Sequence, residues 1–355
     1  MTLNSLENNW ITEFPKPLII AGPCSAESEM QMLETAQRIK ESSAEVSLFR
    51  AGIWKPRTKP NGFEGVGAIG LKWLKKVKDE FGFKTTTEVA NAHHVAAALD
   101  ADVDVLWIGA RSTVNPFTVQ EIAEALKGTE KPVLVKNPVN PDLALWIGAL
   151  ERLLRQDVKN LGAIHRGFST YQKTKYRNNP NWQIALDFRN QFPHIPMIVD
   201  PSHICGNRRG LAGITQEALN LGYNGAMIET HCNPDDAWSD ASQQITPEVL
   251  AELLRNLQIR KSDISGFDEE MGRHRTLISD LDLQLIELLA QRMKISEKIG
   301  ALKKANSIEI FQPERWKIIN EYASQKAEET GMSQEFIEKV FKAIHEESIE
   351  IQNKV

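Results

Sequence analysis

Short apolar runs that repeat along the first 255 residues constrain the fold more than any other feature. Eight strand-like runs recur about every 25 to 35 residues, and each is followed by enough chain for a helix. The runs are LIIAG (18–22), VSLFRAG (46–52), FKTTTEV (83–89), VLWIGA (105–110), PVLVKNP (132–138), LGAIHRG (161–167), PMIVDPS (196–202) and GAMIETH (225–231). Eight strand–helix repeats of this length predict an α/β protein with a (β/α)8 TIM barrel; a doubly wound sheet is the weaker alternative.

The pattern changes after residue 255. Between Phe267 and about Lys304 the chain has no proline, and apolar residues recur at helical spacing. We predict one helix of roughly 35 to 40 residues there, followed by helices over about 313–330 and 333–353. So long a helix cannot cover its apolar face within a small all-α domain, so we expect a homo-oligomer, at least a dimer, through it. The predicted organisation is a barrel over 1–258, a linker over 259–266 that contains RKSDISG, and an all-α domain over 267–355.

Composition limits the cellular compartments and the kinds of partner that we expect for this protein. No apolar run approaches the roughly 20 residues of a membrane span, and the first residues lack the order of a secretion signal. Three cysteines cannot form a disulfide framework, so we expect a cytoplasmic protein. The net charge of −5 disfavours nucleic acid or a membrane surface as a partner. Any anion site must therefore be built from locally gathered basic side chains.

Basic side chains follow several of the predicted strands. The C-terminal strand ends of a barrel meet at one face, which is where barrel enzymes carry their chemistry. At these ends the chain places Arg50, Lys55, Arg57, Arg111, Lys136 and Arg166, together with Glu88, His165 and Asp200. A solvated rim should carry both signs of charge more evenly. We therefore predict a site for a small substrate with phosphate and carboxylate groups, which arginine can bind in bidentate fashion.

Cys24 directly follows the first run, where a core residue, half of a disulfide, a nucleophile or a metal ligand are the alternatives. With His203, Glu229 and Asp240 it would offer a thiolate, an imidazole and two carboxylates. This mixed donor set suits Mn²⁺, Fe²⁺, Co²⁺ or Zn²⁺. The spacing alone is weak support, because the four residues lie on separate strands and loops. Two neighbouring pairs permit a different site: His203 with Cys205, and His231 with Cys232.

Seven motifs carry a family resemblance over about residues 15–255. They are AGPCSAES, FRAGIWKPRTKPNGFEG, WIGARS, VLVKNP, HRGFSTY, VDPSHICGNR and MIETHCNPDDAWSDASQQ. In this order they resemble 3-deoxy-D-arabino-heptulosonate 7-phosphate (DAHP) synthase, in its compact type I beta-like form. The related 3-deoxy-D-manno-octulosonate 8-phosphate (KDO8P) synthases, which use arabinose 5-phosphate, typically read K-A-N-R where this chain reads Lys55-Pro56-Arg57-Thr58.

The resemblance implies a metal-dependent, aldol-type condensation of phosphoenolpyruvate with erythrose 4-phosphate, which opens the shikimate pathway to aromatic amino acids. It implies four metal ligands, Cys24, His203, Glu229 and Asp240, with Mn²⁺ the expected ion. It places phosphoenolpyruvate at Arg50, Lys55, Arg111, Lys136 and Arg166, and the aldose at Arg57, Thr58, Ser112 and Asp200. Lys136 and metal-bound water are the two alternatives for moving protons, and Glu88 is expected to support the site.

Residues 265–355 resemble the all-α, dimeric chorismate mutases, which rearrange chorismate to prephenate. The resemblance implies a site formed by Arg275, Arg292, Lys303, Arg315, Ser348 and Gln352. Helical geometry agrees in part, because Arg292 and Lys303 share one face, as do Ser348 and Gln352. Arg275 lies roughly 25 Å along the helix from Arg292 and cannot join the same pocket within one helix. An antiparallel partner subunit could supply it, and the resemblance implies that it does.

The implied roles follow from charge. The three arginines would clamp the two carboxylates of chorismate, while Lys303 and Gln352 would donate to its ether oxygen. The chain departs from the family at Gln312, usually an aspartate, and at Trp316, usually the glutamate that contacts the substrate hydroxyl. The alternative for this domain is a non-catalytic regulatory and dimerisation module. Because the barrel begins near residue 18, leaving no room for an N-terminal regulatory domain, we also expect prephenate or chorismate to act allosterically on the synthase through it.

Overall fold

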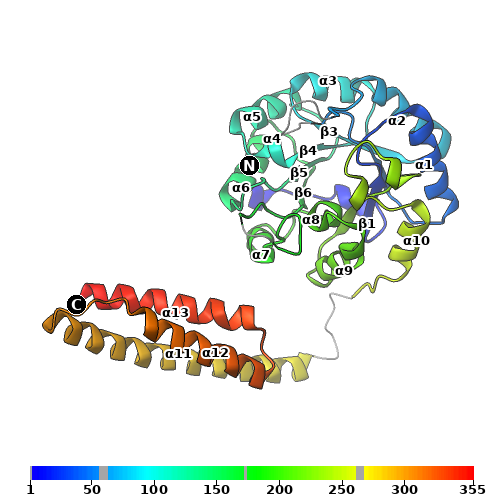
Figure 1. Ribbon diagram of the computed structural model, residues 1–355. Coiled ribbons are helices and arrows are strands. Elements are labelled where there is room, and N and C mark those ends of the chain that lie inside the picture. The colour runs from blue at the N-terminus through cyan, green and yellow to red at the C-terminus, as the bar shows by residue number, and fades with distance from the viewer. Residues whose placement is uncertain (1, 56–62, 172–173, 261–267) are drawn as a thin grey trace. The chain divides into compact units, whose positions relative to one another are not determined.

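The computed structural model describes residues 2–55, 63–171, 174–260 and 268–355. The chain divides into two compact units, Met1–Ser262 and Asp263–Val355 (Figure 1). Within these described ranges, the first unit contains all eight strands and the second contains three helices.

The first unit is a closed barrel of eight parallel strands in the order β1 to β8. Its strands are β1 (Leu18–Gly22), β2 (Leu48–Arg50), β3 (Lys84–Val89), β4 (Val105–Ile108), β5 (Val133–Lys136), β6 (Leu161–His165), β7 (Met197–Val199) and β8 (Gly225–Glu229). β1 pairs with β2 on one side and with β8 on the other, which closes the sheet. The predicted TIM barrel is confirmed, and the doubly wound alternative is wrong.

Two layers of apolar side chains explain why this sequence closes. Successive strand residues point to opposite faces of a sheet. Interior residues such as Ile20, Trp107 and Met227 pack together inside the barrel, while alternate residues pack against the surrounding helices. Trp10 joins the interior group and donates from its indole nitrogen to the carbonyl of Leu161, at the start of β6. The N-terminal end of the barrel is thus filled, and the opposite end carries the polar side chains.

Helices surround the barrel (Figure 1). They are α1 (Glu29–Glu41), α2 (Ile69–Phe81), α3 (Ala92–Asp100), α4 (Ala110–Thr113), α5 (Pro116–Ala125), α6 (Leu143–Arg155), α7 (Trp182–Gln191), α8 (Pro201–Cys205), α9 (Leu211–Asn220) and α10 (Pro247–Arg255). The short helices α4 and α8 directly follow strands β4 and β7. They therefore position residues at the polar end of the barrel.

The second unit consists of α11 (Asp268–Ala305), α12 (Pro313–Thr330) and α13 (Gln334–Lys354). The predicted 35- to 40-residue helix is observed with 38 residues. The core of this second unit is small and is formed by Ala323, Ala327 and Ile337, with Phe341 packed against them. Many apolar side chains of α11 are exposed, for example Leu281 at 57% and Leu288 at 61%. One chain therefore leaves the apolar face of α11 largely uncovered.

In the described part of the chain, no helix combines the length and the apolar character needed to cross a membrane.

Candidate active sites

Cys24, Glu229 and Asp240 form a cluster at the C-terminal end of the barrel. Cys24 follows β1, and Glu229 ends the neighbouring strand β8. Asp240 lies in the next loop, where a left-handed backbone (φ 48°) turns the chain into a short 3-10 helix. One donor atom from each residue lies within 4.8 Å of the others, and Cys24 Sγ is 3.4 Å from Asp240 Oδ2. Sequence positions over 200 residues apart are thus brought together by barrel closure.

The chemistry of this cluster fits a divalent metal ion. Oε1 of Glu229 is buried and accepts no hydrogen bond from any residue that the structure describes, which is unusual for a native carboxylate. Burial, and then the charge of Glu229, raise the pKa of the Cys24 thiol to about 11. A thiol between two carboxylates is unfavourable as a thiolate unless a cation is present. The residues therefore could hold a metal such as Mn²⁺ or Zn²⁺.

His203 lies beside the cluster. The side chain of Asp200 caps α8 and accepts from the backbone nitrogen of His203 at 3.0 Å, which fixes this turn. His203 Nδ1 lies 2.8 Å from Asp200 Oδ2 and 3.9 Å from Glu229 Oε1. Burial lowers the pKa of His203, which favours the neutral imidazole that metals bind. The structure thus groups three of the four predicted ligands and places the fourth against Asp200.

Arg50 provides the clearest sign of an anion site. Its side chain is 1% exposed, and Nη2 lies 3.3 Å from Glu229 Oε1 and 3.2 Å from the carbonyl of Cys24. Nε and Nη1 are buried and have no hydrogen-bond partner among the described residues. Unpaired buried guanidinium donors are costly, so they indicate a place where an anionic ligand binds.

Trp107 forms a platform beneath two predicted substrate-binding cations. The guanidinium of Arg50 lies 5.0 Å from its ring centroid, and Nζ of Lys136 lies 5.8 Å away. The indole nitrogen donates to Glu88 at 3.2 Å, so Glu88 supports the platform. Lys136 donates to Asp200 at 2.7 Å. Burial opposes ionisation of Asp200, but His203 and Lys136 hold its pKa well below the ordinary value.

The remaining predicted cations differ in burial. Arg166 is buried and donates to Asn178 Oδ1 at 2.7 Å; burial lowers its pKa to about 10, so it stays charged at neutral pH. Lys55 places Nζ 3.0 Å from Cys24 Sγ, next to the candidate metal cluster. Arg111 is exposed on α4, and the neighbouring Ser112 is buried. Two predicted phosphate-binding residues, Arg57 and Thr58, lie outside the described residues.

Three residues that the sequence did not single out hold the cluster in place. Arg177 Nη1 donates to Asp240 Oδ1 at 3.0 Å and to Gln243 Oε1 at 2.8 Å. Gln243 in turn donates to Glu229 Oε2 at 2.7 Å, and Gln244 accepts from the backbone nitrogen of Cys24. The two glutamines close the motif that contains Asp240, which was the available signal. Arg177 had none, because it reaches the site from the loop after β6.

Other candidate groups near the strand ends have structural roles. His165 is fully buried, with Nε2 2.7 Å from the carbonyl of Pro180 and Nδ1 2.9 Å from the hydroxyl of Tyr223. Burial lowers its pKa to about 4, so the ring is neutral; Nε2 donates and Nδ1 accepts. Cys205 and Cys232 are also buried and lie outside the donor cluster.

The helical unit brings several predicted mutase residues together between α11 and α13. Arg292 Nη1 donates to Ser348 Oγ at 2.5 Å, and Lys303 Nζ donates to the carbonyl of Ile310 at 2.5 Å. Oε1 of Gln352 is buried and has no hydrogen-bond partner in the described part of the chain. A Cβ on Gly300 would lie 2.9 Å from the Cα of Gln352, so a glycine permits the close approach of the two helices.

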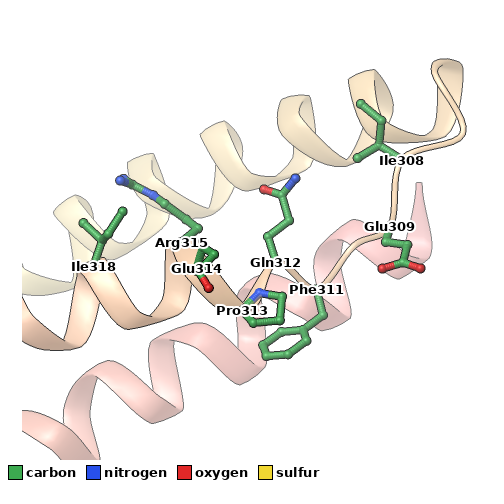
Figure 2. A pocket seen from close by; sticks show the side chains of 8 residues that line it. All are labelled: Ile308, Glu309, Phe311, Gln312, Pro313, Glu314, Arg315 and Ile318. Carbon is green, nitrogen blue, oxygen red and sulfur yellow. The ribbon is translucent and has the colours of Figure 1, made fainter.

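A pocket of about 570 Å³ lies at the start of α12. It is lined by Ile308, Glu309, Phe311, Gln312, Pro313, Glu314, Arg315 and Ile318 (Figure 2). Figure 2 shows Gln312 and Arg315 pointing to one side of the chain and Phe311 to the other, towards α13. Arg315 and Arg275 are both exposed in one chain, whereas Arg292 is half-buried.

Comparisons with known proteins give matches to both units. The model of the DAHP synthetase I family matches residues 9–265, and that of chorismate mutase type II matches residues 274–353. A phospho-2-dehydro-3-deoxyheptonate aldolase of Thermotoga maritima is 30% identical over 240 residues, 68% of each chain. A 2-dehydro-3-deoxyphosphooctonate aldolase of Wolinella succinogenes is 29% identical and covers 68% of this chain and 97% of its own. A crystal structure of the Thermotoga maritima DAHP synthase aligns with a TM-score of 0.60 at 29% identity, over 67% of each chain.

Proposed function

Because the chain belongs to the DAHP synthetase I family and carries a chorismate mutase type II domain, we propose that it is a bifunctional enzyme. Its barrel condenses phosphoenolpyruvate with erythrose 4-phosphate to give DAHP and phosphate. Its helical unit rearranges chorismate to prephenate. The observation that carries the first activity is the buried Arg50 beside the Cys24–Glu229–Asp240 cluster, whose Nε and Nη1 have no hydrogen-bond partner among the described residues.

The barrel residues divide the two substrates between them. Arg50, Lys55, Arg111, Lys136 and Arg166 bind the phosphate and carboxylate of phosphoenolpyruvate by charge-assisted hydrogen bonds. In the sugar site, Arg57, Thr58 and Ser112 bind the phosphate of erythrose 4-phosphate, and Asp200 orients the aldose. C3 of phosphoenolpyruvate attacks the aldehyde carbon, water adds at C2, and phosphate leaves.

Cys24, His203, Glu229 and Asp240 would hold a divalent ion, which would polarise the aldehyde oxygen when bound. Arg177 and Gln243 keep Asp240 and Glu229 in position through the hydrogen bonds described above. Lys136 donates to Asp200 at 2.7 Å and is the protein group placed to move a proton at the condensation site.

The choice of aldose tests the proposed synthase against the related octulosonate enzymes. We expect erythrose 4-phosphate to be used with a kcat/KM at least about 100-fold above that of arabinose 5-phosphate, because contacts to the sugar set the specificity. Phosphate release in the presence of phosphoenolpyruvate and each aldose measures both rates, with phosphoenolpyruvate alone as the control. Faster use of arabinose 5-phosphate would instead support the function of a KDO8P synthase.

In the helical unit, Arg275, Arg292 and Arg315 clamp the carboxylates of chorismate, with Arg275 supplied by a second copy of the chain. Lys303 and Gln352 donate to the ether oxygen, where negative charge grows in the transition state. The apolar face of α11 supports dimerisation, because its leucine side chains remain exposed to solvent in one chain. Trp316, which replaces the usual glutamate, favours a second candidate, a non-catalytic regulatory module; loss of chorismate absorbance with the full chain distinguishes the two.

We expect prephenate to lower the synthase rate of the full chain by at least about fivefold, the range of ordinary allosteric coupling. The measurement is DAHP formation at increasing prephenate concentration, for the wild type and for Arg292→Gln. The variant should lose the inhibition but keep the uninhibited synthase rate, because Arg292 lies in the mutase site. A wild-type rate that does not respond to prephenate or chorismate would rule out this feedback.

A further inference from the structure

One face of α13 presents three polar side chains towards the mutase site. His345, Ser348 and Gln352 are three and four residues apart, so they follow one stripe of the helix. Ser348 accepts from Arg292 of α11. His345 Nε2 and Gln352 Oε1 are buried without a hydrogen-bond partner, and no other described side chain of the helical unit has such an atom. Two unpaired atoms on one stripe indicate a ligand that completes them.

Aromatic side chains fix the ring of His345. It stacks on Trp316 of α12, with ring centroids 4.1 Å apart and an interplanar angle of 17°. The ring of Phe311 lies 5.9 Å away. The imidazole is therefore held in one plane, with Nε2 in the buried interior. Such preorganisation suits a group that binds a ligand in one orientation.

The charges around His345 favour its neutral form. Burial lowers the pKa of His345, and the nearby cations Arg292 and Lys303 of α11 lower it further. Glu346, on α13 itself, opposes them. α12 contributes the uncharged Trp316. A neutral imidazole that carries its proton on Nδ1 offers a lone pair at Nε2.

We propose that His345 accepts a hydrogen bond at Nε2 from the ring hydroxyl of bound chorismate or prephenate, an inference that rests on the proposed mutase function. The arginines and Lys303 can only donate, so the hydroxyl hydrogen of the ligand needs an acceptor, and the fixed Nε2 of His345 offers one. Trp316 of α12 has no acceptor of its own, so it does not compete for the hydroxyl hydrogen. The acceptor therefore lies on α13, and the stacked ring of Trp316 holds it in place.

Substitution of His345 in the full chain tests this role. We expect His345→Leu to lower kcat/KM for chorismate and affinity for prephenate by about tenfold or more, because the hydroxyl is left unpaired. His345→Gln should retain most of both, since its amide oxygen can accept. Glu347→Gln, an exposed neighbour on α13, is the matched control. Chorismate absorbance gives the rate, titration calorimetry gives prephenate binding, and thermal unfolding shows that the variants fold.

A pH profile separates ligand binding from a purely structural role. The wild-type kcat/KM should fall as pH decreases below the ordinary histidine pKa of 6.5, because the protonated ring cannot accept at Nε2. Arginine does not titrate in this range, so Arg292 cannot cause the decline, and His345→Gln should lose it. If His345→Leu keeps the wild-type rate and affinity, His345 does not contact the ligand and the mutase assignment stands. If the wild type neither consumes chorismate nor binds prephenate, the mutase assignment itself fails, together with this role.

Discussion

Replacement of Cys24 by serine should lower DAHP formation by at least about 100-fold and leave chorismate turnover within about twofold. Loss of residues that merely orient metal ligands commonly costs 10- to 100-fold in metal affinity, so loss of a ligand should cost more. The serine hydroxyl is a poor substitute for a thiolate between Glu229 and Asp240. The proposed rearrangement of chorismate in the helical unit needs no metal, so its rate should not change. Metal content after dialysis and both reaction rates measure these effects.

Cys205→Ser is the matched control for Cys24→Ser. Cys205 is equally buried but lies outside the donor cluster. Burial raises the pKa of its thiol to about 12, so it remains a protonated core residue. The control should keep its metal and its synthase rate. A Cys24→Ser protein that binds metal and forms DAHP like the control would exclude Cys24 as a ligand.

Replacement of Arg292 by glutamine should lower kcat/KM for chorismate by about 100-fold or more, the usual cost of removing one preorganised charge-stabilising donor. Arg292 is half-buried and donates to Ser348, so its guanidinium is already fixed before a ligand binds. DAHP formation without prephenate should be unchanged. Chorismate consumption by the purified variant measures the loss.

Lys294→Gln is the control on the same helix, since Lys294 is exposed. It removes the same charge two residues away and should keep chorismate turnover. Similar unfolding temperatures for the two variants would show that the difference is local. Equal activity of Arg292→Gln and Lys294→Gln would mean that the α11–α13 contact is not the mutase site.

The fold was largely predictable because its signals are local. The first strand was predicted at residues 18–22 and is observed there, and the helical tail follows its apolar periodicity closely. Several other predicted strands extended beyond the observed C-terminal ends, for example 196–202 against Met197–Val199. At those ends the chain leaves the ladder, Asp200 caps α8, and His203 lies within α8 beside the cluster.

The candidate site in the barrel could be predicted only at residues whose type and position at a strand end indicate a ligand-binding role. The three-residue cluster and the buried Arg50 lie where strand ends converge. Arg177 was missed because its role arises from a contact with Asp240 across 63 positions of sequence. The direction in which the His203 ring points depends on its side-chain rotamer, which the spacing of residues in the sequence does not specify. His345 was missed for a similar reason: its importance comes from a stacked ring on another helix and from an unpaired atom.

Metal removal distinguishes the two proposed activities most directly. The full chain is assayed for DAHP formation and for chorismate loss, first with EDTA and then after Mn²⁺ is added back. We expect EDTA to reduce DAHP formation to background and Mn²⁺ to restore it, while the chorismate rate stays constant throughout. A DAHP rate that survives EDTA in protein shown to contain no metal would contradict a metal centre at Cys24, His203, Glu229 and Asp240.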